Sequence, residues 1–317
     1  MMTIDELDEK FGIEGELGFI ESEGDLLAIS IFNKYADAEI SLYGGQVMRY
    51  TPQGSFDVLW VSESSFFEEG KAIRGGIPVC FPWFGPHPTD PGKPMHGFAR
   101  LKYWQVVETA SLETGDTKVI LQLTSDEETK ALWQHDFRAL LTVIIGRSLD
   151  VSLTVTNTGS EPLSYSSALH SYFNVSGIAS IRVAGLEGKT FYNGFESTTN
   201  VQQEELLAIE KEENRRYVNV INDCLIIDQP FNQITRVAKR GSNVTVVWNP
   251  GSETAAKMDD ITDEGWQEFI CVEAVNAYND IIHLSAGQSH TTATTISLDL
   301  KASNLRMSEQ DSSFTVI

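Results

Sequence analysis

The residues of this chain that could move protons are a glutamate and a histidine, each set in a strand-like segment. Glu273 interrupts the apolar stretch Phe269 to Val275, where an unpaired carboxylate is costly to bury. Burial would raise the pKa of this carboxyl group toward the range of a general base, and nearby arginines would oppose that shift. A structural glutamate held in a salt bridge is the alternative.

His170 lies in the segment Ser166 to Phe173. Strand alternation would place Ala168, His170 and Tyr172 on one face. A histidine among polar neighbours can exchange protons near neutral pH, whereas a lone histidine can also be purely structural. None of the six histidines forms an HxH or HExxH pattern, so we expect no metal site.

Two arginines could bind an anion. Arg74 opens the stretch RGGIPVCFPWFG, in which two glycines allow close backbone approach and the aromatic rings offer flat surfaces suited to a sugar. Arg100 ends the motif HGFAR, which begins at His96. Together the two guanidinium groups could hold a phosphate or carboxylate. In so acidic a chain each arginine could equally pair with a carboxylate, and His96 could be a capping or core residue.

The elements that must position these residues read mostly as strands. From Val151 to Thr156 apolar and polar residues alternate, which is the period of a half-buried strand. Short strands separated by turn signals rather than by regular helices indicate an all-β antiparallel sandwich or barrel. The further strand candidates are Val119 to Thr124, Leu140 to Ile145, Val244 to Trp248, Phe269 to Ala274 and Thr291 to Leu300.

Two short helices are expected beside the strands. Thr3 and Glu6 fit a capping box at the start of the chain. Ser125 and Glu128 fit a second capping box before a helix from Thr129 to His135. The acidic stretch from 204 to 213 is expected to be a solvated loop or helix face.

Composition limits the class of protein. The 317 residues carry 23 Lys+Arg and 45 Asp+Glu, a net charge of −22, and 41% are hydrophobic. This content supports a large core, and the acidic balance argues against nucleic acid or an anionic membrane surface as a partner. We expect one domain over residues 1–300, a polar tail over 301–317 and a soluble, cytoplasmic monomer. The widely spaced Cys80, Cys224 and Cys271 indicate reduced thiols.

Five segments taken together resemble one known family. The ordered set RGGIPVCFPWFGP, HGFAR, ALHSYFNVS, VVWNP and FICVEAV is similar to the hexose-6-phosphate mutarotases, a branch of the aldose 1-epimerase family. The resemblance runs from about Leu17 to Leu300. It implies a large antiparallel β-sandwich of the galactose-mutarotase type with a few short helices, in agreement with the strand pattern.

The resemblance also implies roles for single residues. The family's catalytic histidine and glutamate correspond to His170 and Glu273. An aspartate in its ETDRxY-like segment corresponds to Asn214, which keeps an acceptor oxygen and loses the charge, unless the neighbouring Glu213 substitutes. The substrate-binding side chains implied in addition are Arg74, His96 and Arg100.

The implied activity is interconversion of the α and β anomers of a hexose 6-phosphate, with glucose 6-phosphate as the expected substrate. Glu273 would take the proton of the C1 hydroxyl and protonated His170 would give one to the ring oxygen, from opposite sides of the anomeric centre. The ring would open and reclose without a metal or other cofactor, while Arg74 and Arg100 hold the phosphate.

Other functions remain open at this point. The chain could be a mutarotase of unphosphorylated aldoses, or a non-catalytic protein that binds a sugar phosphate. A glycoside hydrolase is disfavoured, because Glu273 has no second carboxylate among the matched motifs.

Overall fold

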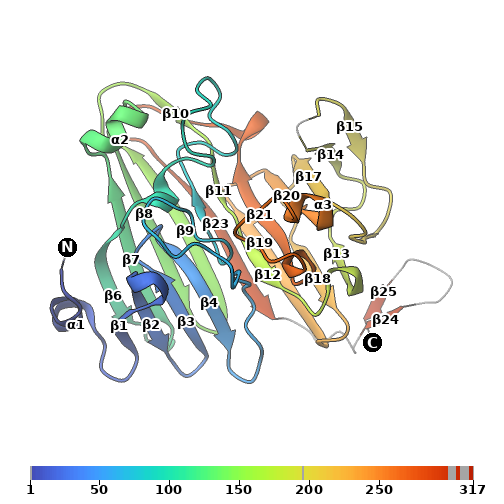
Figure 1. Ribbon diagram of the computed structural model, residues 1–317, viewed down its shortest axis with the longest axis horizontal. Helices are drawn as coiled ribbons and strands as arrows, with labels where there is room; N and C mark the ends of the chain where they lie inside the picture. Colours follow the sequence, from blue (N-terminus) through green and yellow to red (C-terminus); the bar gives the residue numbers. More distant parts are fainter. Residues whose placement is uncertain (1, 195, 299–304, 308–313, 317) are drawn as a thin grey trace.

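The structure, a computed structural model, describes residues 2–194, 196–298, 305–307 and 314–316. Strands dominate it (Figure 1) and pair antiparallel in sheets of four, eight and nine strands. No helix in this described part of the chain is long and apolar enough to cross a membrane.

The four-stranded sheet comes first in the chain and appears in blue in Figure 1. Its strands follow the chain order, as expected for a run of hairpins. They are β1 (Leu17–Glu21), β2 (Leu27–Phe32), β3 (Ala36–Ser41) and β4 (Gln46–Pro52).

The nine-stranded sheet contains the longest strands, β9 and β23, at its centre. In spatial order its strands are β16 (Leu206–Leu207), β13 (Ile181–Ala184), β18 (Cys224–Asp228), β19 (Gln233–Arg240), β23 (Ser289–Leu298), β9 (Ser148–Asn157), β8 (Phe137–Ile145), β7 (Thr117–Thr124) and β6 (Gln105–Ser111).

The eight-stranded sheet carries most of the sequence motifs. Its path is β15 (Thr199–Val201), β14 (Thr190–Asn193), β17 (Glu213–Val218), β20 (Val244–Asn249), β21 (Phe269–Asn276), β11 (Ser167–Leu169) and β5 (Val79–Cys80), and β12 (Tyr172–Asn174) also pairs with β21.

Smaller elements complete the described residues. The remaining strand pairs are β10 (Leu163–Tyr165) with β22 (Ile282–Leu284) and β24 (Leu305–Met307) with β25 (Phe314–Val316). The helices are α1 (Ile4–Phe11), α2 (Glu127–Leu132) and α3 (Gly251–Ala255), and the 3₁₀ turns are Glu23–Asp25, Ala99–Leu101, Ile178–Ser180, Gly265–Gln267 and Tyr278–Asp280.

The main hydrophobic core joins all three large sheets. Ile31 of β2, Leu153 of β9 and Val272 of β21 belong to the same buried cluster. Their neighbours Cys271 and Val275 on β21 lie in two separate clusters, because successive side chains of a strand point to opposite faces. One face of the eight-stranded sheet therefore packs on the main core, and the other face presents Glu273.

Most of the expected elements are confirmed. All six predicted strands are present, as β7, β8, β9, β20, β21 and β23. The last of them ends at Leu298, so the predicted residues 299 and 300 lie outside the described part. α1 has the predicted capping box, in which Thr3 and Glu6 cap each other reciprocally.

The predicted start and end of the second helix need correction. The box that starts α2 joins Asp126 and Thr129 rather than Ser125 and Glu128: the Asp126 carboxylate accepts from the backbone N–H of Thr129 at 2.7 Å. This helix ends at Leu132, short of the predicted end. The acidic stretch 204–213 contains the short strand β16 and no helix, and its last residue, Glu213, begins β17. In the predicted tail, the described residues form the β24–β25 pair.

Candidate active site

Strand register brings His170 and Glu273 opposite each other. Ala274 pairs with Leu169 on β11 and Cys271 pairs with Tyr172 on β12, so the same register sets Glu273 across from His170. Nε2 of His170 lies 3.4 Å from Oε1 of Glu273, and the two side chains are 9% and 1% exposed. The two residues form a buried acid–base pair.

His170 lies in a break between two strands and not within one continuous strand. β11 ends at Leu169 and β12 begins at Tyr172, while the backbone N–H of His170 donates to the carbonyl of Pro78 at 3.1 Å. The predicted alternation still holds across the break, because Ala168 and Tyr172 lie on the outer face and Leu169 lies in the main core.

Burial favours the neutral form of both members of the pair. It lowers the pKa of His170 to about 3, an effect that Arg74 and Arg100 reinforce. It raises the pKa of Glu273 well above its ordinary value. Among the described residues, neither Nδ1 of His170 nor Oε2 of Glu273 has a hydrogen-bond partner. The pair therefore carries one proton, and part of its hydrogen-bonding capacity is unused.

Arg74 is fixed by two neighbours. Its Nε and Nη2 donate to Oδ2 of Asp260 at 3.0 and 2.8 Å, and its Nη1 donates to the hydroxyl of Tyr172 at 2.8 Å. Tyr172 in turn stacks on the ring of His170, with centroids 4.9 Å apart. Arg74 is therefore tied to the histidine through one tyrosine.

Arg100 is less well compensated than Arg74. Its Nη2 donates to the carbonyl of Met95 at 2.8 Å, and its buried Nε has no partner among the described residues. No described carboxylate lies within ion-pair distance of it, and burial lowers its pKa, with Arg74 contributing in the same direction. No contact between the two guanidinium groups joins Arg100 to Arg74 among the described residues. Both groups nevertheless lie close enough to His170 to lower its pKa.

His96 lies beside the pair. Its ring centroid is 5.6 Å from that of His170 and 5.0 Å from that of Phe84, and its Nδ1 accepts from the backbone N–H of Gly85. Burial, followed by Arg100, lowers its pKa well below the usual value. His96 is thus a neutral ring in the wall around the pair.

Asn214 shares the outer face with the pair. It is opposite Trp248 on β20, whose ring centroid is 6.0 Å from that of His170. Glu213 cannot replace the family's aspartate, because it projects from the other face of β17 and pairs with Arg215 at 3.1 Å. The structure therefore brings all six predicted site residues to one face of the sheet.

Sequence reasoning assigned no role to four residues near this face: Tyr172, Arg216, Asp260 and Tyr278. Arg216 is opposite Val246, which is opposite Glu273, so the three form one cross-strand row. Its guanidinium lies 4.3 Å from the ring centroid of Tyr278. The same-face spacing from Asn214 to Arg216, and from His170 to Tyr172, is a signal that could have found two of them. Asp260 and Tyr278 lie in loops whose sequences give no comparable pattern.

The β-sandwich, with the candidate site on the outer face of its eight-stranded sheet, has the galactose-mutarotase type of fold. A crystal structure from Salmonella typhimurium, titled as that of a "putative mutarotase", superposes with a TM-score of 0.85 over 92% of this chain and 96% of the other, at 29% identity. A structure titled as a galactose mutarotase related enzyme from Lactobacillus acidophilus, at 14% identity, shares the fold with a TM-score of 0.69.

The family sequence model described as aldose 1-epimerase matches residues 28–297, so the chain belongs to the aldose 1-epimerase family and is an isomerase. A protein of Escherichia coli K12 named "Putative glucose-6-phosphate 1-epimerase" is 35% identical over 241 residues, covering 76% of this chain and 80% of its own length. A protein of Cenchrus ciliaris with the same name is 36% identical over 245 residues, 74% of each chain.

Proposed function

We propose that the chain interconverts the α and β anomers of a hexose 6-phosphate, glucose 6-phosphate first among them, at the His170–Glu273 pair. The observation that carries this proposal is the buried His170–Glu273 pair beside Arg100, a guanidinium that makes no ion pair with any described carboxylate. Buried charges are usually paired, so Arg100 favours an anionic substrate. The names of the relatives support the same substrate.

The pair suits the chemistry of an anomeric carbon. The sequence-based mechanism sets the two groups on opposite sides of that carbon, whereas the structure sets them side by side, 3.4 Å apart. The hydroxyl oxygen and the ring oxygen are bonded to one carbon, so adjacent groups can each hydrogen bond one of them. One group takes the hydroxyl proton while the other protonates the ring oxygen, and the ring opens to the aldehyde.

The pair carries one exchangeable proton, whichever of His170 and Glu273 acts as the acid and whichever as the base. Burial places that proton on Glu273 at rest, and its transfer to His170 gives the carboxylate and imidazolium of the expected mechanism. Rotation about the C1–C2 bond followed by reversal of the transfers closes the other anomer. Arg100 and Arg74 would hold the phosphate and contribute binding energy remote from the reacting carbon.

The test is the relaxation of freshly dissolved α-glucose 6-phosphate to its anomeric equilibrium, followed by polarimetry with and without protein. α-Galactose is the matched neutral substrate. We expect acceleration of the phosphosugar above all. Equal or greater acceleration of galactose would contradict the proposed substrate, and no acceleration of either sugar would contradict the proposed reaction.

A mutarotase of unphosphorylated aldoses is the second candidate. The Asp260 carboxylate on Arg74 favours it, since this ion pair offsets one of the positive charges near the site. The same relaxation experiment separates the two substrates.

A further inference from the structure

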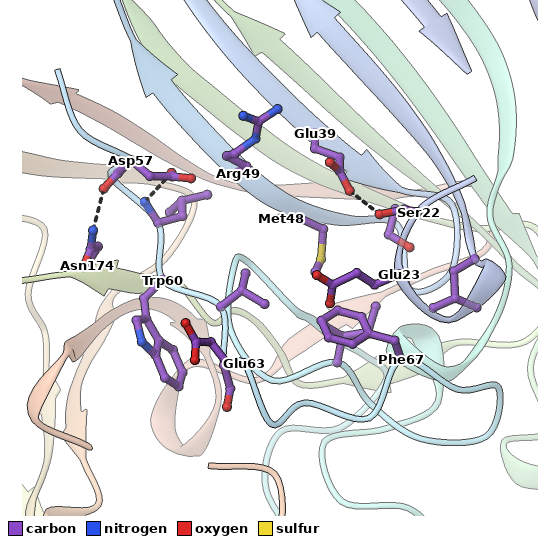
Figure 2. A pocket seen from close by; sticks show the side chains of 16 residues that line it. Ser22, Glu23, Glu39, Met48, Arg49, Asp57, Trp60, Glu63, Phe67 and Asn174 are labelled. Carbon is purple, nitrogen blue, oxygen red and sulfur yellow. Dashed lines mark hydrogen bonds between the residues drawn. The ribbon is translucent and has the colours of Figure 1, made fainter. Parts of the chain in front are cut away.

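A cavity, called the second cavity below to separate it from the candidate active site, lies away from the His170–Glu273 pair. It has a volume of about 390 Å³, within the range of small-molecule sites, and Figure 2 shows the side chains that line it. It lies between the four-stranded sheet and the segment that leads from β4 to Arg74. None of the six predicted site residues lines it.

One edge of this cavity carries a cation between two carboxylates. Glu39 on β3 is directly opposite Arg49 on β4, and Figure 2 shows Arg49 between Asp57 and Glu39. Burial raises the pKa of Asp57 to about 6, and Arg49 and Glu39 act on it in opposite directions. Yet among the described residues Arg49 makes no ion pair within 4 Å. Oδ1 of Asp57 accepts from the backbone N–H groups of Tyr50 and Leu59, so Oδ2 of Asp57, Oε2 of Glu39 and the Arg49 guanidinium are the groups left for a ligand.

A buried hydroxyl adds unused hydrogen-bonding capacity. Ser41 lines the cavity and is only 4% exposed, and its Oγ has no hydrogen-bond partner among the described residues. Buried polar groups are rarely left unpaired, so such an atom in a cavity wall points to a ligand group or to water. Ser22 lies nearby and donates to Glu39 at 2.6 Å.

Part of the wall is apolar. Leu26, Met48 and Ile73 belong to one buried cluster, and Phe67 packs against it. All four line the cavity. This wall offers a surface for C–H groups beside the charged edge.

The charges restrict the ligand class. Four carboxylates line the cavity against one guanidinium, so a phosphate or carboxylate ligand would be repelled. The Arg49 guanidinium between Glu39 and Asp57 disfavours a compact cation beside these two carboxylates. A ligand that offers both donors and acceptors, carries no charge and has a C–H face fits these constraints.

We propose that this cavity binds a neutral polyhydroxylated ligand, a sugar without a phosphate, through Glu39, Arg49 and Asp57. This site is separate from the proposed phosphosugar site. It favours a neutral sugar over a phosphorylated one, whereas the phosphosugar site favours the phosphorylated sugar. The proposal does not depend on which sugar the His170–Glu273 pair turns over.

The test uses methyl α-D-glucopyranoside, whose locked anomeric carbon prevents mutarotation, titrated calorimetrically into the full chain. We expect saturable binding that Arg49→Met and Glu39→Gln each weaken by about tenfold or more, the scale of one hydrogen bond to a charged group. Arg138→Met, which replaces an exposed arginine on β8, is the matched control and should bind as the wild type does. Thermal unfolding midpoints verify that each variant folds.

Three results would overturn the proposal. The first is no binding of the glucoside by the wild type. The second is binding that survives both cavity substitutions. The third is complete, competitive displacement of the glucoside by glucose 6-phosphate, which would place it at the His170–Glu273 pair; displacement that saturates below completion would instead indicate two coupled sites. Binding of putrescine in place of the glucoside would show that the cavity takes a cation.

Discussion

The opposite pKa directions of His170 and Glu273 determine how the proposed reaction responds to pH. The pair works while it carries one proton, and it gains a second only when His170 is protonated. With the His170 pKa lowered to about 3, that second proton binds far below the ordinary histidine range. We therefore expect kcat at saturating glucose 6-phosphate to change little between pH 7 and pH 5; kcat is the quantity to follow because kcat/KM also reports the phosphate of the free substrate, whose second pKa is about 6. A stopped-flow pH profile that falls with a midpoint near 6.5 would contradict this.

Glu273 is the residue whose substitution should lower the enzymatic rate most. Glu273→Gln keeps the size of the side chain but cannot exchange a proton, so we expect the enzymatic rate to fall by about 10²–10⁴-fold. The measurement is the relaxation rate of α-glucose 6-phosphate. Circular dichroism and thermal unfolding serve as the control for folding. A folded variant with wild-type turnover would exclude Glu273 from the chemistry.

Arg100 should decide between charged and neutral substrates. Arg100→Met removes a guanidinium whose Nε has no described partner, so little structure depends on that atom. We expect KM for glucose 6-phosphate to rise by about 10–100-fold, the scale of a hydrogen bond to a charged group. The kinetics of α-galactose should be unchanged. An equal loss for both sugars would indicate a structural role.

At the scale of elements, the glycine pair after Arg74 holds the site together. Gly76 has a φ of +60°, and a Cβ there would lie 2.2 Å from the carbonyl oxygen of Val47. Its backbone also bonds to both Trp60 and Tyr172. The close approach that the two glycines suggest in the sequence is thus an approach to the protein's own strands.

Gly76→Ala tests this packing. We expect it to lower the free energy of unfolding by about 1–3 kcal/mol, because both the left-handed backbone and the contact are unfavourable. Gly188→Ala is the matched control: Gly188 also has a positive φ, of +70°, but nothing lies within 4 Å of its added Cβ. Urea denaturation measures both, and equal losses would show that the contact with Val47 has no effect.

The strands could be predicted from the sequence where one face is buried and the other is not. In β9 the burial alternates over most of its length, so the pattern of Val151 to Thr156 identified it. The break at His170 could not be predicted, because it depends on pairing with both β21 and the segment at Pro78. The cap of α2 was misplaced by one residue, since Ser125 and Asp126 can both cap a helix.

At the scale of the whole molecule, the core and the site lie on opposite faces of the eight-stranded sheet. Leu153 of β9 is 1% exposed in the main core. We expect Leu153→Ala to lower the free energy of unfolding by about 2–5 kcal/mol. KM for glucose 6-phosphate should not change at temperatures where the variant is folded. A changed KM in the folded variant would show that the core sets the geometry of the site.

The motifs predicted which residues meet, but not how they are held. Arg74 and Asp260 are 186 positions apart in the chain and meet through the fold alone. No local pattern could identify Asp260 as the partner, because the chain has many carboxylates. The same holds for Arg100: that it makes no ion pair with any described carboxylate is a property of the folded chain.

The wall between the two proposed sites is a single strand-like segment. The N–H of Trp60 donates to the carbonyl of Tyr172, and the N–H of Ser62 donates to the carbonyl of Arg74. Trp60 and Ser62 also line the second cavity. A ligand that shifts this segment therefore changes the affinity of the other site, and thermodynamic linkage makes the effect mutual. Binding of the free sugar would then depend on the concentration of the phosphosugar, and binding of the phosphosugar on that of the free sugar, through this one shared segment of backbone.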